Sequence, residues 1–345
     1  MIIFALESSC DETAVAVVRD GREVLSSELF SQADMHAMYG GVVPEIASRN
    51  HAAVIGRLSD LALKNACISK SEINAVAVTF APGLIGALLV GVNYAKGLSM
   101  ALDVPLIPVH HIRGHIAAGY IAFPDLTPPF LCLIVSGGSS LITDVRGYTD
   151  ISIIGRSRDD AAGECFDKAA RMLGLGYPGG PALDKLAQNN LAQGNLAQGG
   201  NDSRFDLPRP VIEGFPYDMS FSGLKTAVVN IVHNAEQKGE VIDTASLAAS
   251  FSRTVSDILV PRVISAALEL GHNKIVVAGG VAANSRIRAD FEKAAAENNL
   301  SLFIPPLELC GDNAAMIGCQ GYYEYLAGVR AGMDLDAYAT MDVDM

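Results

Sequence analysis

The sequence predicts an α/β protein with two domains. A chain of 345 residues is longer than one hydrophobic core usually serves. Strand-like and helix-like segments alternate along it, which is typical of layered α/β folds. A strand, a polar turn and a second strand occur at residues 2–18 and again at residues 130–145. This repetition predicts a duplicated fold with a cleft between its halves.

The composition favours a compact globular protein. Half of the residues are hydrophobic and 18% are charged, a balance that supports a buried core and argues against disorder. Every long apolar stretch is interrupted by Gly, Asn, Lys or a charge, so we expect no membrane-spanning segment and no membrane partner. The first residues run directly into a strand without a basic region or cleavage site, so no targeting segment is expected.

The cysteines and the net charge indicate the cellular compartment and the kinds of partner to expect. No Cys-x-x-Cys pair is present, which predicts reduced thiols and a cytoplasmic protein. The formal net charge is −13, from 25 basic and 38 acidic side chains. Nucleic acid repels an acidic chain on average, so contact with it requires a local basic surface or another chain. The six cysteines are Cys10, Cys67, Cys132, Cys165, Cys310 and Cys319.

The first half alternates expected strands with expected helices. The segment Glu7–Thr13 is a polar turn with acidic residues, and Asp20-Gly21 is a hairpin signal. Actin-like ATPase folds present a strand, an acidic polar turn and a strand to phosphate, although an ordinary hairpin has the same pattern. We expect strands at residues 2–6, 14–18, 23–31, 75–80 and 104–107, and helices at 44–66, 84–102 and about 111–121.

The second half continues the alternation. Pro261 is expected to interrupt a long helix, and the acidic, aperiodic residues 332–345 are expected to fray. The five-residue Leu-Ala-Gln repeat at residues 186–200 fits neither helix nor strand periodicity, which indicates a surface loop without chemistry. We expect strands at residues 130–135, 141–145, 274–278 and 301–304, and helices at 158–173, 181–191, about 220–232, 244–270, from 285 onward and 314–327.

Two histidines stand four residues apart at the start of an expected helix. This spacing projects His111 and His115 from one helix face, where two imidazoles can bind one metal ion. A histidine pair that only caps and lines the helix start has the same pattern. Asp312 precedes the apolar helix at 314–327, at a position where a helix N-cap and a ligand carboxylate are competing uses.

Glycine-rich turns follow two of the expected strands in the second half. Gly137 and Gly138 allow the backbone to approach a phosphate with main-chain N–H groups as donors, although an ordinary hairpin turn also fits. The strand at 274–278 ends in Gly279-Gly280, and a helix begins at Ser285. A helix N-terminus behind such a turn is a place where a nucleotide can lie.

A series of motifs along nearly the whole chain resembles one family. Motifs in a fixed order are far more specific than a single glycine-rich turn. Together they closely resemble the tRNA N6-adenosine threonylcarbamoyltransferases, the TsaD family, formerly described as O-sialoglycoprotein endopeptidases. The motifs are Glu7–Thr13, Tyr39–Glu45, Val109–His115, Val135–Gly138, Asp159–Lys168, Tyr177–Pro181, Phe221–Thr226, Gly279–Asn284 and Asp312–Met316.

The resemblance implies a fold and two kinds of ligand. The implied fold is the two-domain actin-like ATPase fold, with duplicated mixed-sheet domains around a cleft. One divalent metal ion per chain is implied at His111, His115 and Asp312, with iron favoured and zinc left open. A site for an adenylate or ATP-type nucleotide is implied at Ile134, Val135, Ser136, Gly137, Gly138, Asp167, Gly180, Asp184 and Asn284.

The resemblance also implies a reaction and partners. The implied activity transfers the threonylcarbamoyl group of threonylcarbamoyl-adenylate to N6 of adenosine 37 in tRNAs that read ANN codons, with release of AMP. In bacterial members an inactive TsaB-type paralogue and a small TsaE-type ATPase complete the complex. Asp11 and Glu12 are candidates to orient the amine or take its proton, and Asp11 is the predicted catalytic residue. Many members carry His where this chain has Ser139, so a metal or phosphate role there is unsupported.

Three other functions match parts of the sequence. A zinc metalloprotease of the His-Glu-x-x-His type needs Glu directly after the first histidine, and this chain has Ile112 there. An ATP-dependent kinase or ATPase switch of the same fold would bind Mg²⁺ through carboxylates and phosphates and has no use for a histidine pair. A scaffold would use its nucleotide site only to stabilise a complex, whereas the presence of all three implied metal ligands favours an enzyme.

Domain boundaries and a tRNA surface can also be predicted. Residues 1–125 and 314–345 are assigned to an N-terminal domain, and residues 126–313, with the loop at 186–200, to a C-terminal domain. With 25 basic and 38 acidic side chains, the isolated chain should bind tRNA weakly, and a partner complex is expected to supply the rest of the positive field. The candidate tRNA contacts are the arginines close to site motifs: Arg113, Arg204, Arg209, Arg286 and Arg288.

Overall fold

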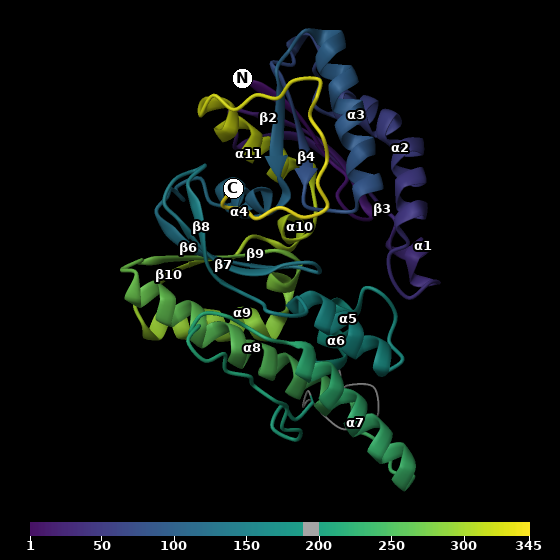
Figure 1. Ribbon diagram of the computed structural model, residues 1–345, viewed down its shortest axis with the longest axis vertical. Helices are drawn as coiled ribbons and strands as arrows, with labels where there is room; N and C mark the ends of the chain where they lie inside the picture. Colours follow the sequence, from purple (N-terminus) through teal and green to yellow (C-terminus); the bar gives the residue numbers. More distant parts are fainter. Residues whose placement is uncertain (189–199) are drawn as a thin grey trace. The chain divides into compact units, whose positions relative to one another are not determined.

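The computed structural model describes residues 1–188 and 200–345, so most of the repeat predicted as a loop lies outside the described residues. The described chain divides into two compact units. The first comprises Met1–Pro129, Val145–Ser152 and Pro305–Met345, and the second comprises Phe130–Asp144 and Ile153–Ile304. Within the described residues, each unit is built on one five-stranded sheet with packed helices (Figure 1).

The sheet of the first unit has the strand order β3-β2-β1-β4-β5. Strands β1, β2 and β3 pair antiparallel, whereas β4 and β5 run parallel to β1, so the sheet is mixed. The central strand β1 sets the register, with Ala5 opposite Ala16 on one side and Ala77 on the other. The strands are β1 (Ile2–Glu7), β2 (Glu12–Arg19), β3 (Glu23–Ser31), β4 (Ala75–Ala81) and β5 (Leu106–His110).

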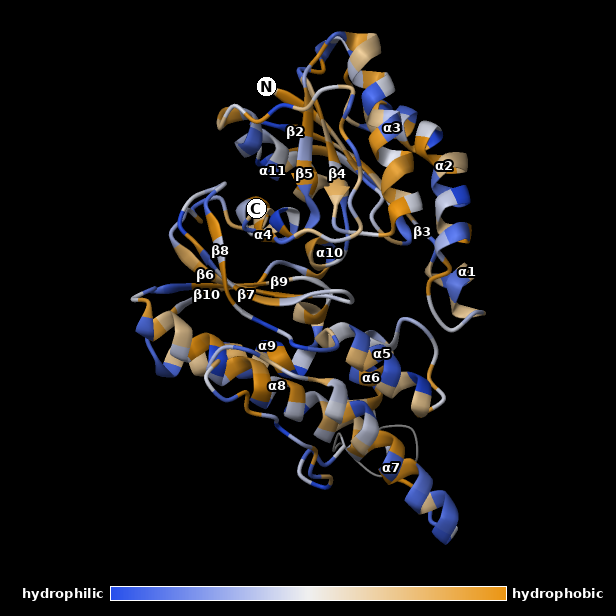
Figure 2. Cartoon of the chain, viewed as in Figure 1, coloured by the Kyte–Doolittle hydropathy of each residue, from blue (hydrophilic) through white to orange (hydrophobic). Residues whose placement is uncertain are grey.

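Helices cover both faces of this sheet, which is why its central strands are apolar on both sides. Helices α2 (Pro44–Asn65) and α3 (Ile85–Leu102) pack on one face, and α4 (His111–Ala122) and α11 (Ala314–Leu326) on the other (Figure 1). Successive residues of β1 alternate between the two hydrophobic cores on either side of the sheet. The strands of both sheets are mainly orange in Figure 2.

Small residues let α11 lie close to the sheet. A Cβ atom at Gly318 would lie 2.6 Å from Val18 Cγ2, and one at Gly321 would lie 2.6 Å from Ala77 Cβ. Larger residues there would push the helix away from the sheet. The short helices of this unit are α1 (Ala33–Ala37), the 3-10 turn η1 (Lys70–Glu72) and α10 (Leu307–Cys310).

The second unit repeats the strand order of the first, as β8-β7-β6-β9-β10. This repetition confirms the predicted α/β fold with duplicated sheets. Helices α8 and α9 pack against the sheet through β6 and β10. The elements are β6 (Phe130–Val135), β7 (Ser140–Val145), β8 (Ile151–Arg156), α5 (Ala162–Met172), α6 (Gly179–Gln188), α7 (Ser222–Lys238), α8 (Thr244–Glu269), β9 (Lys274–Ala278), η2 (Gly280–Ala283), α9 (Ser285–Glu297) and β10 (Ser301–Phe303).

Three single elements differ from the expectations. Helix α8 continues through Pro261, because residues on both sides of the proline, such as Leu259 and Val263, are fully buried and packing holds the helix together. The strand β8 is not among the expected strands, although Gly147 and Asp150 precede it in a turn that Arg146 N closes by donating to Asp150 O (3.0 Å). The helix expected from residue 158 begins only at Ala162.

The expectation that residues 332–345 fray is also wrong. We call residues 331–345 the C-terminal strap. Its main chain bonds to the first unit through Ala331 N to Leu106 O (2.9 Å) and Tyr338 N to Phe80 O (2.9 Å). Val343 is 1% exposed. The strap is therefore ordered by hydrogen bonds and by small apolar contacts that its acidic composition conceals.

One described helix has the length and apolar character to cross a membrane. This helix is α3, and a core helix of a soluble protein passes the same test. Here α3 packs on β4 and on α2. All six cysteines are free thiols, and four of them are buried: Cys132, Cys165, Cys310 and Cys319.

Candidate metal centre

The site begins where β5 ends and α4 starts. His110 is the N-cap of α4, and its Nδ1 accepts a hydrogen bond from Ile112 N (3.2 Å). Burial lowers the pKa of His110 to about 4, so this ring is neutral and serves the helix end. His111 and His115 follow one turn apart on α4, with ring centroids 4.7 Å apart.

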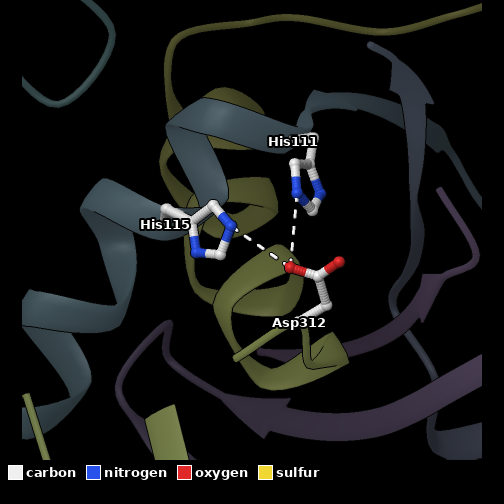
Figure 3. Close-up of side chains that lie close together, drawn as sticks. All are labelled: His111, His115 and Asp312. Atoms are coloured by element: carbon white, nitrogen blue, oxygen red, sulfur yellow. Dashed lines mark ion pairs between the residues drawn. The ribbon is translucent and has the colours of Figure 1, made fainter. Parts of the chain in front are cut away.

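Asp312 reaches the two histidines from the turn before α11. The competing use of Asp312 as an N-cap does not occur, because Asn313 caps α11 and accepts from Met316 N (2.9 Å). Asp312 Oδ1 therefore lies 3.4 Å from His111 Nε2 and 3.2 Å from His115 Nε2 (Figure 3). Helices α4 and α11 pack together, which fixes these distances within the first unit.

The cluster fits a metal ion. One possible ligand atom from each of the three residues lies within 4.8 Å of the others. Ligands about 2.1 Å from a shared ion, at octahedral to tetrahedral angles, are about 3.0 to 3.4 Å apart. His115 is 1% exposed; its Nε2 faces Asp312 without good hydrogen-bond geometry, and its Nδ1 has no hydrogen-bond partner among the described residues. Buried polar atoms seldom lack a partner, and a bound cation would supply one.

The pKa shifts within the cluster also favour a bound cation. Burial disfavours the imidazolium of His111, but the nearby carboxylates of Asp312 and Glu7 outweigh it and raise its pKa well above the usual value. Burial also disfavours the Asp312 carboxylate, but His111 and His115 hold its pKa well below the usual value. A divalent cation that displaces the proton from His111 would be stabilised by the same carboxylates.

Reasoning from the sequence missed Glu7 as a neighbour of the metal centre. Glu7 is the last residue of β1, and its Oε2 lies 3.0 Å from His111 Nδ1. A signal was present in the sequence: a carboxylate directly follows the apolar strand Ile2–Leu6. Pairing of this residue with a histidine 104 positions away could not be inferred from spacing.

The predicted catalytic residue lies on the turn between β1 and β2. Asp11 is 5% exposed and neighbours Glu12. Burial, together with the charges of Asp312 and Asp11, raises the pKa of Glu12 to about 9. The raised pKa means that this environment disfavours the charged form of Glu12.

The residues predicted to bind a nucleotide lie in the second unit. Ile134 and Val135 end β6, and Ser136, Gly137 and Gly138 form the turn that follows. The turn is closed by Ser136 N donating to Ser139 O (2.8 Å). A Cβ atom at Gly137 or Gly138 would meet nothing within 4 Å, so these glycines leave open space beside the turn. The main-chain carbonyl of Ser139 thus stabilises the turn.

The other predicted nucleotide residues connect α5, α6 and α9. Asp167 accepts from Gly179 N (2.7 Å), next to Gly180 at the start of α6. Asp184 accepts from Ser285 Oγ (2.7 Å) at the start of α9. Asp184 also lines a cavity of about 640 Å³.

Asn284 caps α9 by accepting from Ile287 N (3.1 Å). Its Nδ2 is buried and forms no hydrogen bond with a described residue. This amide is therefore a donor with no protein acceptor in the described chain, close to the parallel pair β6–β9, where the glycine turns lie.

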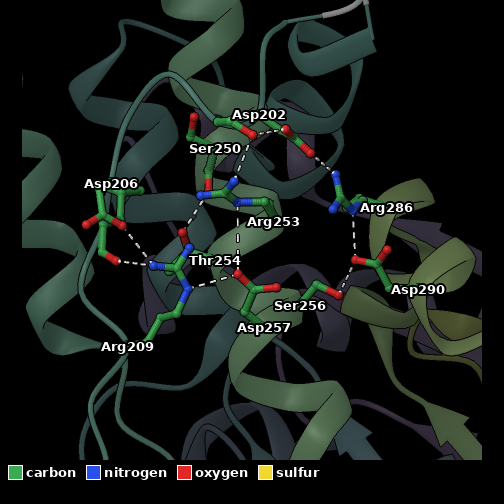
Figure 4. Close-up of polar contacts among 12 residues, drawn as sticks. Asp202, Asp206, Arg209, Ser250, Arg253, Thr254, Ser256, Asp257, Arg286 and Asp290 are labelled. Atoms are coloured by element: carbon green, nitrogen blue, oxygen red, sulfur yellow. Dashed lines mark hydrogen bonds and ion pairs between the residues drawn. The ribbon is translucent and has the colours of Figure 1, made fainter. Parts of the chain in front are cut away.

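The arginines expected to contact tRNA are mostly paired with carboxylates. Arg113 pairs with Glu324 (3.0 Å). In the second unit, ion pairs tie residues 202–209 to α8 and α9 (Figure 4). These pairs neutralise the positive charge locally, and the assignment of the five arginines as tRNA contacts stays a prediction. The pairs in the second unit are Arg204 with Asp243, Arg209 with Asp206 and Asp257, and Arg286 with Asp202 and Asp290, while Arg288 lies on α9.

Comparison with solved structures identifies the fold. T. kodakarensis HypF is similar with a TM-score of 0.60 and 17% sequence identity, over 97% of this chain and 49% of that chain. HypF in a phosphate- and nucleotide-bound form is similar with a TM-score of 0.59 and 14% identity, over 99% of this chain and 47% of that chain. These likenesses show the two-domain actin-like ATPase fold that the motifs implied.

Comparison by sequence identifies the family. The family model described as TsaD, tRNA N6-adenosine threonylcarbamoyltransferase, matches residues 23–319. An enzyme of that name from Clostridium botulinum (strain 657 / Type Ba4) is 48% identical over 97% of this chain and 96% of its own length. Another from Staphylococcus saprophyticus is 48% identical over 99% of this chain and 97% of its own length. The chain therefore belongs to the family of tRNA N6-adenosine threonylcarbamoyltransferases.

Proposed function

We propose that this protein transfers the threonylcarbamoyl group of threonylcarbamoyl-adenylate to N6 of adenosine 37 in tRNAs that read ANN codons, releasing AMP. The full-length similarity to enzymes named for this reaction supports the proposal. The single structural observation that carries it is the cluster of His111, His115 and Asp312. A kinase or ATPase switch of the same fold would have no use for that cluster.

His111, His115 and Asp312 would hold one divalent ion. Iron and zinc both accept two imidazoles and a carboxylate, and we favour iron. Three protein ligands leave positions open, as in catalytic metal sites. The ion, when bound, would polarise the carbonyl of the threonylcarbamoyl group.

Residues of the second unit would bind the adenylate. We propose that main-chain N–H groups of the turn Ser136–Gly138 and the N-terminal end of α9 interact with its phosphate. Asp167, Asp184 and Asn284 would position the nucleoside, together with Ile134, Val135 and Gly180. AMP is a good leaving group, so the reaction requires no covalent intermediate with the protein.

Asp11 is the proposed proton acceptor. A new bond forms between N6 of the adenosine and the carbamoyl carbon, while the bond from that carbon to the adenylate oxygen breaks. The amine loses a proton in this step, and a carboxylate nearby can accept it. Burial and the charges of Asp312 and Asp11 disfavour the carboxylate form of the neighbouring Glu12. We assign the role to Asp11.

The proposed reaction implies a cellular compartment and a set of partners. We propose that it works in the cytoplasm with tRNA, an inactive TsaB-type paralogue and a small TsaE-type ATPase. The net charge of −13 supports a need for partners that supply positive charge. We also propose that the two compact units correspond to the two domains of the duplicated fold.

Metal analysis of ligand variants tests this proposal. His111→Ala and Asp312→Ala should each lose the ion that the wild-type protein binds, because two remaining ligands hold a divalent ion weakly. The matched control is His233→Ala, since His233 lies exposed on α7. Metal content is measured after removal of excess metal, with circular dichroism to verify folding. Full occupancy in both ligand variants would contradict the assignment.

A further inference from the structure

A carboxylate behind the candidate metal centre is held by three partners. Glu7 is 1% exposed and has no solvent-accessible side-chain surface. Its Oε1 accepts from Ser9 N (2.6 Å). Its Oε2 accepts from Thr79 Oγ1 (2.6 Å) and lies 3.0 Å from His111 Nδ1. Glu7 therefore has little freedom to move or to choose another partner.

Glu7 lies at the end of the central strand of the first unit's sheet. Glu7 ends β1, and Thr79 lies on the adjacent parallel strand β4, where Leu6 pairs with Val78. Both strands lie between helices on the two faces of the first unit. A side chain on such a rigidly packed strand can orient a side chain on a neighbouring helix, because its own position is fixed.

The two histidines of the cluster differ in their surroundings. His111 Nδ1 faces the Glu7 carboxylate (3.0 Å) and, less closely, Ser9 Oγ (3.3 Å), and its Nε2 faces Asp312 (3.4 Å). His115 Nδ1 forms no hydrogen bond with a described residue. A neutral imidazole carries one proton, and the nitrogen that carries it cannot bind a metal ion. A carboxylate beside one nitrogen therefore decides which nitrogen is the ligand.

We propose that Glu7 is the positioning residue of the metal centre. It accepts the Nδ1–H of His111 and thereby leaves Nε2, the nitrogen that faces Asp312, as the ligand atom. Glu7 acts through His111, because it contacts the ring on the side away from Asp312. This inference rests on the metal site of the proposed function.

A purely structural role for Glu7 is the alternative. The hydrogen bonds from Ser9 and Thr79 would by themselves satisfy a buried carboxylate at a strand end. In that case a change at Glu7 would lower stability and leave the metal affinity of the folded protein unchanged. The two roles are separated by measuring both quantities.

Glu7→Gln is the informative substitution because it keeps the size of the side chain. If the amide oxygen faces His111, the amide NH₂ group faces the Ser9 N–H, and two donors meet. If the NH₂ group faces His111, either Nδ1 accepts and Nε2 carries the proton, or the Nδ1–H opposes the NH₂ group and keeps only the longer contact to Ser9 Oγ (3.3 Å). Either arrangement disfavours metal binding through Nε2. Zn²⁺ affinity should fall by about 10- to 100-fold, the usual effect of losing such a partner.

The control is the same substitution at another buried carboxylate of the first unit. Glu324 is 3% exposed and pairs with Arg113 and Gln320, without contact to His111 or His115. Zn²⁺ affinity is measured by chelator competition for the wild-type protein, Glu7→Gln and Glu324→Gln, and thermal stability is measured without metal. Only Glu7→Gln should bind Zn²⁺ more weakly. Equal affinity of all three proteins would overturn the proposal.

A second measurement needs no variant. In zinc-loaded wild-type protein labelled with ¹⁵N-histidine, the His111 resonances should show a protonated Nδ1 and a metal-bound Nε2. Metal bound to Nδ1 would also overturn the proposal, even if Glu7→Gln fails to fold. A wild-type protein that binds no Zn²⁺ would instead contradict the metal site itself. Failure of this inference and failure of the proposed function are thus distinguishable.

Discussion

At the residue scale, two capping side chains leave the candidate ligands free. His110 caps α4 and Asn313 caps α11, so His111 and Asp312 need not serve the helix ends next to them. Each ligand lies directly beside its cap in the sequence. The hydrogen-bond needs of a helix N-terminus and the ligand needs of an ion are therefore met by neighbouring residues.

A glycine beside the predicted nucleotide turn gives a sharp test at this scale. Gly279 has φ +93°, and a Cβ atom there would lie 2.4 Å from Val135 O. We predict that Gly279→Ala destabilises the protein by about 2 kcal/mol or more, combining a disfavoured backbone conformation with overpacking. The matched control is Gly280→Ala, where a Cβ atom would meet nothing within 4 Å. Chemical denaturation measures both, and equal stability of the two variants would refute the packing argument.

At the element scale, the longest described helix depends on its N-cap. Asp243 caps α8 by accepting from Ser246 N (3.0 Å) and Ser246 Oγ (2.6 Å), and it pairs with Arg204 (2.7 Å). The hydrogen bonds from Ser246 are the main cause that lowers the pKa of Asp243. We predict that Asp243→Ala lowers the free energy of unfolding at neutral pH by about 1 kcal/mol.

The pH dependence of this effect has a definite sign. A carboxyl group with a lowered pKa in the folded protein stabilises it above the unfolded-state pKa of about 3.9. That contribution is lost as the pH falls through the folded-state pKa, so the wild-type protein and Asp243→Ala should converge in acid. Asp243→Asn keeps an acceptor but cannot titrate, and its cap should persist. Denaturation at neutral and acidic pH measures this, and a constant difference between wild type and Asp243→Ala would contradict it.

Local patterns predicted the elements whose own sequence decides them. The strands β1, β2 and β6 are short apolar runs between turn signals, and each formed near its expected position. The C-terminal strap and the course of α8 through Pro261 depend on packing against distant residues, which periodicity does not report. The strap bonds to the main chain at Leu106 and Phe80, and neither contact has a sequence signature.

The candidate site also contains residues that local sequence could predict and residues that it could not. The spacing of His111 and His115 on one helix face is a local property, and it was predictable. The approach of Asp312 came from family resemblance, since its separation from His111 spans about 200 residues and local spacing gives no information over that length. Glu7 was missed for the same reason. The arginine pairs were missed because proximity in sequence to a motif says nothing about which carboxylates lie nearby.

At the scale of the whole molecule, charge decides how the protein meets tRNA. The net charge is −13, and four arginines near the site motifs are engaged in ion pairs. The chain therefore presents a weak positive field of its own, whereas tRNA binding depends on neutralising phosphates. Partner proteins that supply positive charge would resolve this conflict, which is why the transfer reaction should require them.

The most direct test of the central claim is the amount of threonylcarbamoyladenosine formed in unmodified tRNA. The metal-loaded protein is incubated with threonylcarbamoyl-adenylate, that tRNA and the partner proteins, and the modified nucleoside is quantified by mass spectrometry. We predict modification by the wild-type protein and none by folded Asp312→Ala, because that variant lacks one of the three proposed metal ligands. Modification by Asp312→Ala at the wild-type rate, or none by the wild-type protein with all components present, would contradict it.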